Sequence, residues 1–301
     1  LRPLVDGYFL LSLVQNECFV KVVLDNCTGT SYPAINANDL ANIEVCFPTN
    51  SEEQQQIGDN FRSLDLLITL HEHKCAETKK LKRYMLQKMF PQNGKEIPEI
   101  RFAGFTDDWE QHKLGEMMEI TSVKRIHQSD WTNSGVRFLR ARDIVAESKK
   151  EEVTGPLFIS QEKYDEYSAL SGKVKIGDLL VTGVGTIGVP MLINSEEPLY
   201  FKDGNIIWFK NGDTIDGRFF YHSFNSDNTQ KFIRESAGIG TVGTYTIESG
   251  KKTPINLPHQ KEEQIKIGEY FSHLDHLIAL NQRRCDDLKE VKKFMLQNMF
   301  V

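Results

Sequence analysis

Positively charged side chains are concentrated in one stretch near the middle of the chain. Between positions 124 and 142, five cations stand against a single acidic residue, Asp130. Arginine can hydrogen-bond guanine edges, and both arginine and lysine bind phosphate, so the stretch suits nucleic-acid binding. A solvated charged face without a ligand is the alternative that the residue types leave open. The cations are Lys124, Arg125, Arg137, Arg140 and Arg142.

Further polar residues extend this predicted interface. Asn133 can reach base edges or phosphates, and Thr186 lies in a glycine-rich turn. If residues 140–142 form an extended strand, the side chains of Arg140 and Arg142 point to the same face. The complete predicted DNA-binding set is Lys124, Arg125, Asn133, Arg137, Arg140, Arg142, Lys173, Lys175, Thr186, Lys202 and Asn205.

The sequence contains no recognisable catalytic motif, and we predict no enzyme activity for this chain. Residues 183–188 and 238–243 match the pattern GxGxxG. A dinucleotide site needs that pattern at a strand-to-helix turn, whereas strand-like residues follow each copy, 191–193 and 245–247. We interpret both as glycine turns between strands. Scattered histidines and the absence of a CxxC pair predict no metal site.

An internal repeat indicates which elements position these residues. Residues 48–90 align without gaps onto 258–300 at an offset of 210. Each copy has the apolar spacing of a long helix, with steps of three and four residues. The predicted pairing and docking positions are Ile57, Phe61, Leu64, Ile68, Ile267, Phe271, Leu274 and Ile278. Two amphipathic core helices of one globule are the alternative, but the length and repetition favour a paired spacer.

Two polar residues interrupt the apolar seams of the predicted helices. His71 lies in the first seam and Asn281 at the same offset in the second. A polar residue in such a seam fixes the register of the pair at some cost in stability.

Residues 99–257 have a different composition, rich in Gly, Thr and short β-branched runs, which predicts a compact α/β mixed domain. Residues 29–45 resemble residues 240–255 weakly and only with gaps. The predicted order is therefore a domain remnant at 1–50, a first spacer helix at 51–93, a whole domain at 94–258 and a second spacer helix at 259–301.

Charge and apolar content limit the cellular setting. The net charge is −6, so nucleic-acid binding must depend on local basic patches. The five cysteines are odd in number and widely spaced, which favours a reducing compartment. Residues 1–13 lack a basic leader, and no segment reaches 18 apolar residues. We predict a cytoplasmic protein that does not contact a membrane.

Several blocks together resemble the specificity subunits of type I restriction-modification systems. The resemblance is strong over about residues 48–301 and weak before that. Its blocks are 101–110 (RFAGFTDDWE), 113–116 (KLGE), 138–144 (FLRARDI), 177–182 (GDLLVT), 185–188 (GTIG) and Pro258 with 262–264 (EEQ).

The resemblance implies two target recognition domains joined by two long antiparallel coiled-coil helices, each domain reading one half of a split DNA site. It implies double-stranded DNA, two methyltransferase subunits and an ATP-dependent restriction subunit as partners. S-adenosylmethionine, ATP and Mg are then expected on those partners, with no cofactor in this chain. The sequence departs from the pattern because its first recognition domain lacks most of its N-terminal part, which puts the first half-site in doubt.

Two other hypotheses compete with DNA reading. A coiled-coil scaffold or protein-interaction module would have no salt-dependent affinity for DNA. An enzyme hidden in the mixed domain would show activity in the isolated chain.

Overall fold

The computed structural model describes residues 5–29, 33–92, 95–212, 214–237 and 243–300. The chain divides into two compact units, which we describe separately. Unit 1 contains residues 1–80 and 275–301, and unit 2 contains residues 81–274. Two 38-residue helices, α4 (Ser51–Lys88) and α11 (Lys261–Asn298), contribute to both units. The predicted mixed fold with two long helices is confirmed.

Unit 1 begins with three short helices, each with a side-chain cap. The Asp6 carboxylate accepts a hydrogen bond from the Phe9 amide, and Asn16 and Asn36 cap the next two helices in the same way. Short polar side chains at these positions satisfy amides that have no partner within the helix. The helices are α1 (Gly7–Gln15), α2 (Glu17–Asp25) and α3 (Ala37–Ala41).

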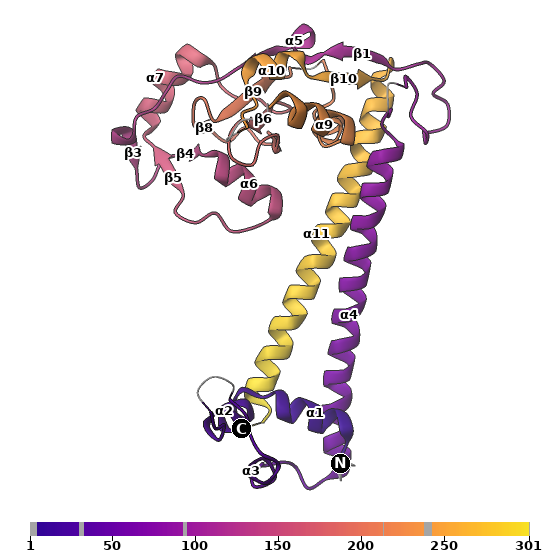
Figure 1. Cartoon of the computed structure of the whole chain (residues 1–301), viewed down its shortest axis with the longest axis vertical. Coiled ribbons are helices and arrows are strands. Elements are labelled where there is room, and N and C mark those ends of the chain that lie inside the picture. The colour runs from indigo at the N-terminus through magenta and orange to yellow at the C-terminus, as the bar shows by residue number, and fades with distance from the viewer. Residues whose placement is uncertain (1–4, 30–32, 93–94, 213, 238–242, 301) are drawn as a thin grey trace. The chain divides into compact units, whose positions relative to one another are not determined.

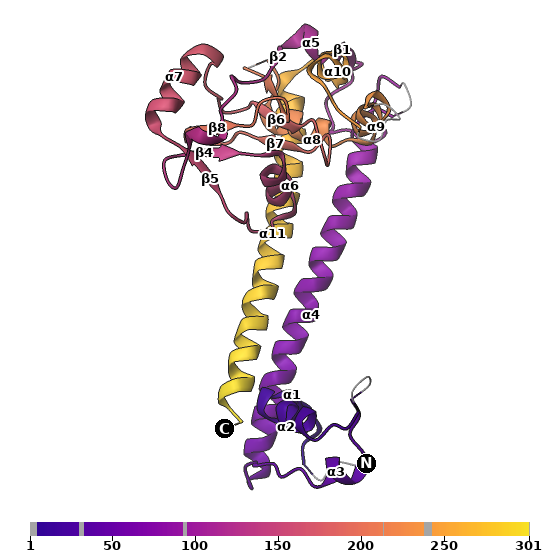
Figure 2. The same cartoon turned by 60° about the vertical axis from the view of Figure 1, so that its left-hand side comes forward.

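In unit 1, α4 and α11 pack side by side and antiparallel (Figures 1 and 2). Asp65 pairs with Lys292, and Glu72, further along α4, pairs with Lys289, earlier on α11. His71 Nδ1 lies 2.9 Å from Asn281 Oδ1. The two seam residues of the predicted register therefore hydrogen-bond each other. All five cysteines are free thiols, and Cys75 and Cys285 are buried.

Unit 2 contains two four-stranded sheets and a two-stranded ribbon. The first sheet has the order β2-β9-β6-β7 and is antiparallel throughout. The second has the order β3-β5-β4-β8, in which β4 and β8 are parallel. Ribbon strands β1 and β10 are antiparallel. The bounds are β1 (Glu110–Lys113), β2 (Glu119–Thr121), β3 (Trp131–Thr132), β4 (Val136–Leu139), β5 (Leu157–Ile159), β6 (Leu179–Thr182), β7 (Pro190–Leu192), β8 (Leu199–Phe201), β9 (Ile206–Lys210) and β10 (Pro254–Leu257).

Short helices connect and cover these strands. The predicted strand at residues 245–247 is wrong, because Thr246 caps a helix that starts at Ile247. The helices are α5 (Leu114–Met117), η1 (Gln128–Asp130), α6 (Ala141–Lys149), α7 (Gln161–Ser171), α8 (Gly217–Phe224), α9 (Asp227–Ser236) and α10 (Ile247–Lys252).

The central strands of unit 2 are apolar because they are covered on both faces. All four residues of β6 are buried, as are the first four of β9. Such continuous apolar runs are typical of strands with no solvent face. Two apolar clusters result, one around Phe209 and Phe219 and the other around Phe138 and Trp208. The strands are therefore fixed, and side chains at their ends are held in defined positions.

The internal repeat is longer than the sequence indicates. Helices α1, α2, α3 and α4 begin at residues 7, 17, 37 and 51, and α8, α9, α10 and α11 begin at 217, 227, 247 and 261. Every pair differs by 210. The expectation that residues 1–50 align only with gaps is thus wrong. The signal at this end of the repeat is short, since Asp6, Gly7 and Phe9 match Asp216, Gly217 and Phe219.

Two glycines show why this part of the repeat resists change. A Cβ atom on Gly58 would lie 2.4 Å from Asp6 Oδ1 and 2.9 Å from the Phe9 nitrogen. The equivalent atom on Gly268 would lie 2.7 Å from Asp216 Oδ1 and 2.8 Å from the Phe219 nitrogen. In each unit, the long helix therefore receives the capped start of α1 or α8 at a position where only glycine fits.

Over the described ranges, no single helix has the length and apolar content needed to cross a membrane. Helices α1 and α2, bent by 65° with respect to each other, meet that test of length and composition only when taken together.

Candidate nucleic-acid interface

Three segments of unit 2 meet where strands of both sheets end. The Lys202 amide donates to the Leu139 carbonyl at 2.8 Å, which joins the end of β8 to the end of β4. The Gly183 amide donates to the Asn205 carbonyl at 2.8 Å, which joins the turn after β6 to the turn before β9. We call the resulting region the strand-end surface; its candidate residues are Arg140, Arg142, Thr186, Lys202 and Asn205.

The glycine-rich turn at residues 183–188 is held from several sides. Thr182 Oγ1 donates to the Thr186 carbonyl at 2.5 Å, and Gln230 Nε2 donates to the Gly188 carbonyl at 2.9 Å. Gly185 has a φ of 69° and open space around it, and Thr186 is exposed. The turn links β6 to β7, which confirms a turn between strands. Most of the second match, at 238–243, lies outside the described residues.

The expectation that residues 140–142 are extended is wrong. Arg140 is the N-cap residue of α6, and Ala141 is already helical. Its guanidinium makes two 2.9 Å hydrogen bonds to Asp143, whose side chain is 2% exposed. Its Nη2 also donates to the Gly155 carbonyl at 2.8 Å, so the Nε and Nη2 donors are occupied within the fold and Arg140 closes the helix start. Arg142, with a 61% exposed side chain, keeps more of its surface available.

Lys202 and Asn205 occupy the turn between β8 and β9. Lys202 Nζ lies 3.8 Å from Asp203 Oδ1, and the Lys202 side chain is 28% exposed. Asn205 is half-buried, and its backbone carbonyl holds the glycine turn. Asparagine can donate to and accept from an adenine edge, while lysine suits a phosphate. The strand-end surface thus combines both types of contact with an exposed turn.

A second group of candidates surrounds α7. Lys124 Nζ lies 5.0 Å from the ring centre of Tyr167, and Lys173 Nζ lies 5.1 Å from that of Tyr164. Lys163, which the sequence reasoning missed, lies 5.2 Å from the Tyr167 ring. Acids of α7 neutralise part of this charge, since Asp165 pairs with Lys173 and Glu166 with Lys163. Neutralised cations release fewer counterions on DNA binding.

The remaining candidates are Arg125, Asn133, Arg137 and Lys175. Arg137 lies on β4, with its guanidinium 5.7 Å from the ring centre of Phe158. Burial raises the pKa of nearby Glu147, and the charge of Arg137 opposes that rise. Asn133, Arg125 and Lys175 are exposed. The structure therefore separates the predicted set into the strand-end surface, the α7 group and single positions.

The candidate helix positions differ in burial. Phe61 and Phe271 are fully buried, and Ile57 and Leu64 are half-buried. The buried members are Phe61, Ile68, Ile267, Phe271, Leu274 and Ile278. Other apolar side chains on the same helices are exposed at matching repeat positions: Leu70 and Leu280, Leu81 and Val291, and Tyr84 and Phe294.

Unit 2 has the chemical groups of a nucleic-acid-recognition protein. They are a glycine turn, an asparagine, a lysine and an arginine, and they lie at the ends of its sheets. Comparison with known proteins identifies the family. Residues 106–290 match the type I restriction modification DNA specificity domain, and the chain belongs to this family.

Two curated relatives agree with that family. The chain is 27% identical over 305 residues to a type I restriction enzyme specificity subunit of Methanocaldococcus jannaschii, covering 96% of this chain and 68% of the relative. It is 29% identical over 171 residues to a putative type I restriction enzyme specificity subunit of Haemophilus influenzae, covering 56% of this chain and 41% of the relative.

Two solved structures share the fold. The type I restriction-modification S subunit of M. genitalium has a TM-score of 0.66 at 16% identity, with 99% of this chain and 73% of that chain covered. The HsdS subunit of Thermoanaerobacter tengcongensis has a TM-score of 0.55 at 19% identity, with 98% and 70% covered. The chain is thus a type I specificity-subunit family member whose role is recognition of DNA sequence, a role that is non-catalytic in this family in general.

Proposed function

We propose that this chain reads one half of a split DNA site through the strand-end surface of unit 2. The observation that carries the proposal is the pair of backbone hydrogen bonds that fixes Lys202, Asn205 and the glycine turn together. Preordered groups lose little conformational entropy on binding, so they can discriminate between bases. In this arrangement Lys202 and Arg142 contact phosphates, and Asn205 and Thr186 face the bases.

We further propose that α4 and α11 dock two methyltransferase subunits. The exposed apolar residues occur as matched pairs on the two helices, such as Leu70 with Leu280 and Tyr84 with Phe294. Leu70, Leu81 and Tyr84 fall on one face of α4, because 11 residues make close to three helical turns. Two equivalent apolar faces suit two copies of one partner.

In this proposal the chemistry belongs to the partner subunits. The methyltransferase subunits bring S-adenosylmethionine, and a restriction subunit brings ATP and Mg for translocation and cleavage. The chain itself supplies the sequence choice and the docking faces, with double-stranded DNA as its direct ligand. A cytoplasmic location stays a prediction that accompanies this role.

The test is binding of randomised DNA by the complex formed with a co-expressed type I methyltransferase subunit. Lys202→Ala should weaken binding to all sequences and reduce the dependence of log K on log salt by about one. Asn205→Ala should instead relax the choice at one base position, at a cost of about 1–3 kcal/mol for the preferred base.

Lys173→Ala is the matched control, because it removes a lysine of the α7 group that, like Lys202 beside Asp203, has an acidic neighbour, Asp165. It should change affinity less than Lys202→Ala does. Equal losses from the two variants would contradict the assignment of the strand-end surface while leaving the α7 group as the reading face.

A further inference from the structure

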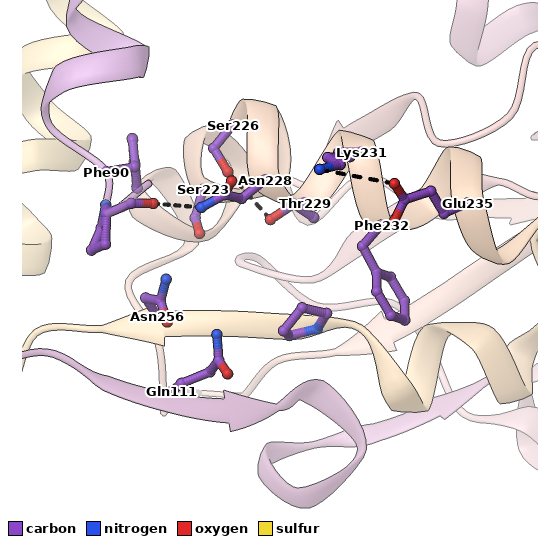
Figure 3. Close-up of a pocket in the computed structure, with 12 residues that line it drawn as sticks. Phe90, Gln111, Ser223, Ser226, Asn228, Thr229, Lys231, Phe232, Glu235 and Asn256 are labelled. Carbon is purple, nitrogen blue, oxygen red and sulfur yellow. Dashed lines mark hydrogen bonds and ion pairs between the residues drawn. The ribbon is translucent and has the colours of Figure 1, made fainter. Parts of the chain in front are cut away.

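Unit 2 contains a pocket that is separate from the strand-end surface. It has a volume of about 270 Å³ and lies between helix α9 and the ribbon of β1 and β10, with Phe90 at one end (Figure 3). Pockets that hold drug-sized ligands measure about 300–1,000 Å³, so a smaller ligand, of about the size of a nucleoside, suits this space. The lining includes none of the residues that we assign to the strand-end surface.

Two side-chain carboxamides lie next to each other on the ribbon side of the pocket. Gln111 of β1 and Asn256 of β10 are directly opposite each other in the ribbon, and both line the pocket (Figure 3). Neither side chain has a hydrogen-bond partner within the part of the chain that the structure describes. Each carboxamide presents donors beside an acceptor. The ribbon therefore offers two donor–acceptor pairs that the fold itself does not use.

A buried hydroxyl on the helical side of the pocket also lacks a partner. Ser223 is 4% exposed, and it lies across the space from Asn256 (Figure 3). Its hydroxyl makes no hydrogen bond to any residue in the described ranges. The nearby Ser226 and Thr229 instead bond each other, with their hydroxyl oxygens 3.3 Å apart. Because buried hydroxyls are normally hydrogen-bonded, Ser223 indicates a polar ligand in the pocket.

The charges around the pocket favour a neutral ligand. Lys231 and Glu235 are the charged residues of the lining; both are exposed, and their side chains lie 4.0 Å apart. Asp227 in the first turn of α9 offsets the positive end of that helix. Among the described residues, no group of three or more His, Cys, Asp or Glu could hold a metal ion. A neutral ring with hydrogen-bonding edges therefore fits better than an anion or a metal.

An aromatic side chain and the two carboxamides together favour adenine among such rings. Phe232 is half-buried, and its ring points toward the ribbon (Figure 3). Aromatic rings stack on nucleobases. The amino group of adenine stands between two ring-nitrogen acceptors, so each of two edges can pair with one carboxamide, the usual contact of Asn and Gln with this base. Guanine presents two acceptors on the matching edge, and one of them would meet a carboxamide oxygen.

We propose that this pocket binds the adenine ring of a nucleoside or nucleotide. Gln111 and Asn256 pair with the two edges that share the amino group, and the Ser223 hydroxyl donates to a remaining ring nitrogen. Phe232 covers one face of the ring. The site is a second binding site of the chain, apart from the strand-end surface, so the inference does not depend on which DNA sequence the chain reads.

The experiment titrates the 301-residue chain with adenosine and follows binding by saturation-transfer NMR. We expect a dissociation constant of about 1 mM or lower. Inosine, which carries a carbonyl in place of the amino group, should bind at least about tenfold more weakly, because it cannot donate from that position. Photo-crosslinking with 8-azidoadenosine should label the chain within residues 223–235 or 254–256. Displacement of adenosine by single-stranded oligo(dA) would identify an unpaired base of nucleic acid as the source of the ring, and its absence a free nucleoside.

Two exposed glutamines of unit 2 offer a matched pair of variants. Gln111→Ala should weaken adenosine binding at least about tenfold, as expected for loss of one bidentate contact. Gln260→Ala should leave it unchanged, because Gln260 lies outside the lining and bonds Asp107. Thermal denaturation checks that both variants are folded. The proposal is wrong if adenosine does not bind saturably at millimolar concentration, if inosine binds equally well, or if the two variants lose affinity equally. None of these results would alter the DNA selection described above.

Discussion

Replacing Arg101 with methionine should destabilise unit 2 strongly. Arg101 is the partner of Glu263, and their side chains are 12% and 0% exposed. The Glu263 hydrogen bond is the main cause that raises the pKa of Arg101 above its usual value, so the arginine stays charged in the folded unit. Without it, Glu263 is left as a buried carboxylate whose hydration has been lost.

The expected loss is about 3–5 kcal/mol of unfolding free energy, the usual cost of removing one partner from a buried pair. The double variant Arg101→Met/Glu263→Met should regain most of that loss, because two apolar residues need no polar partners. The matched control is Lys251→Met at the exposed pair with Glu248, where the loss should be far smaller because solvent screens the two charges.

Urea denaturation followed by tryptophan fluorescence is the assay. Trp109, Trp131 and Trp208 all belong to unit 2, so the signal reports that unit alone. A loss from Arg101→Met no larger than that from Lys251→Met would refute the reasoning. So would a double variant less stable than the single variant, because the buried charge would then not be the source of the loss.

Three further predictions concern pH, packing and register. Burial lowers the pKa of His222 to about 3, whereas an unfolded histidine titrates near 6.5. As the pH falls, the unfolded state therefore binds a proton before the folded state does. Unit 2 should lose up to about 1.4 kcal/mol of stability per pH unit below pH ~6.5. His222→Gln should flatten that slope in urea titrations, and an unchanged slope would exclude His222 as its source. Gly268→Ala and Gly58→Ala should each lower the free energy of unfolding by about 1–3 kcal/mol, because the added methyl group meets backbone. Gly7→Ala is the control, because Gly7 has open space around it. Thermal denaturation compares the three variants, and an unchanged stability of Gly268→Ala would contradict the close approach. Asn281→Leu should lower the free energy of unfolding by about 1–3 kcal/mol, because His71 loses its hydrogen-bond partner in the seam. The double variant His71→Leu/Asn281→Leu should recover that stability in far-UV circular dichroism melts. A solvent-exposed pair would not show this recovery.

The long helices could be predicted because their apolar spacing repeats over many turns. Phe61 and Phe271 are buried where the spacing placed them, and His71 meets Asn281. The first part of the repeat was harder to recognise. Several residue types can cap a helix, so Asn36 and Thr246 both accept a hydrogen bond from a first-turn amide although the two residues differ. Only the three-residue match at Asp6, Gly7 and Phe9 marked its start.

The candidate interface was predictable in residue type but not in arrangement. Arg140 looked like a DNA-binding arginine, yet it is held by Asp143 three residues later, and both open strand and helix start fit that spacing. The meeting of Thr186, Lys202 and Asn205 depends on hydrogen bonds between segments that are distant in sequence. Such tertiary contacts leave no periodic signal, so only the fold could bring these residues together.

The most direct test of the central claim is selection from randomised DNA by the complex of this chain with a type I methyltransferase subunit, at low and high salt. We predict enrichment of a defined motif at both salt concentrations, with one position relaxed by Asn205→Ala. A stable complex that binds DNA without enriching any sequence would contradict the claim that this chain supplies the sequence choice.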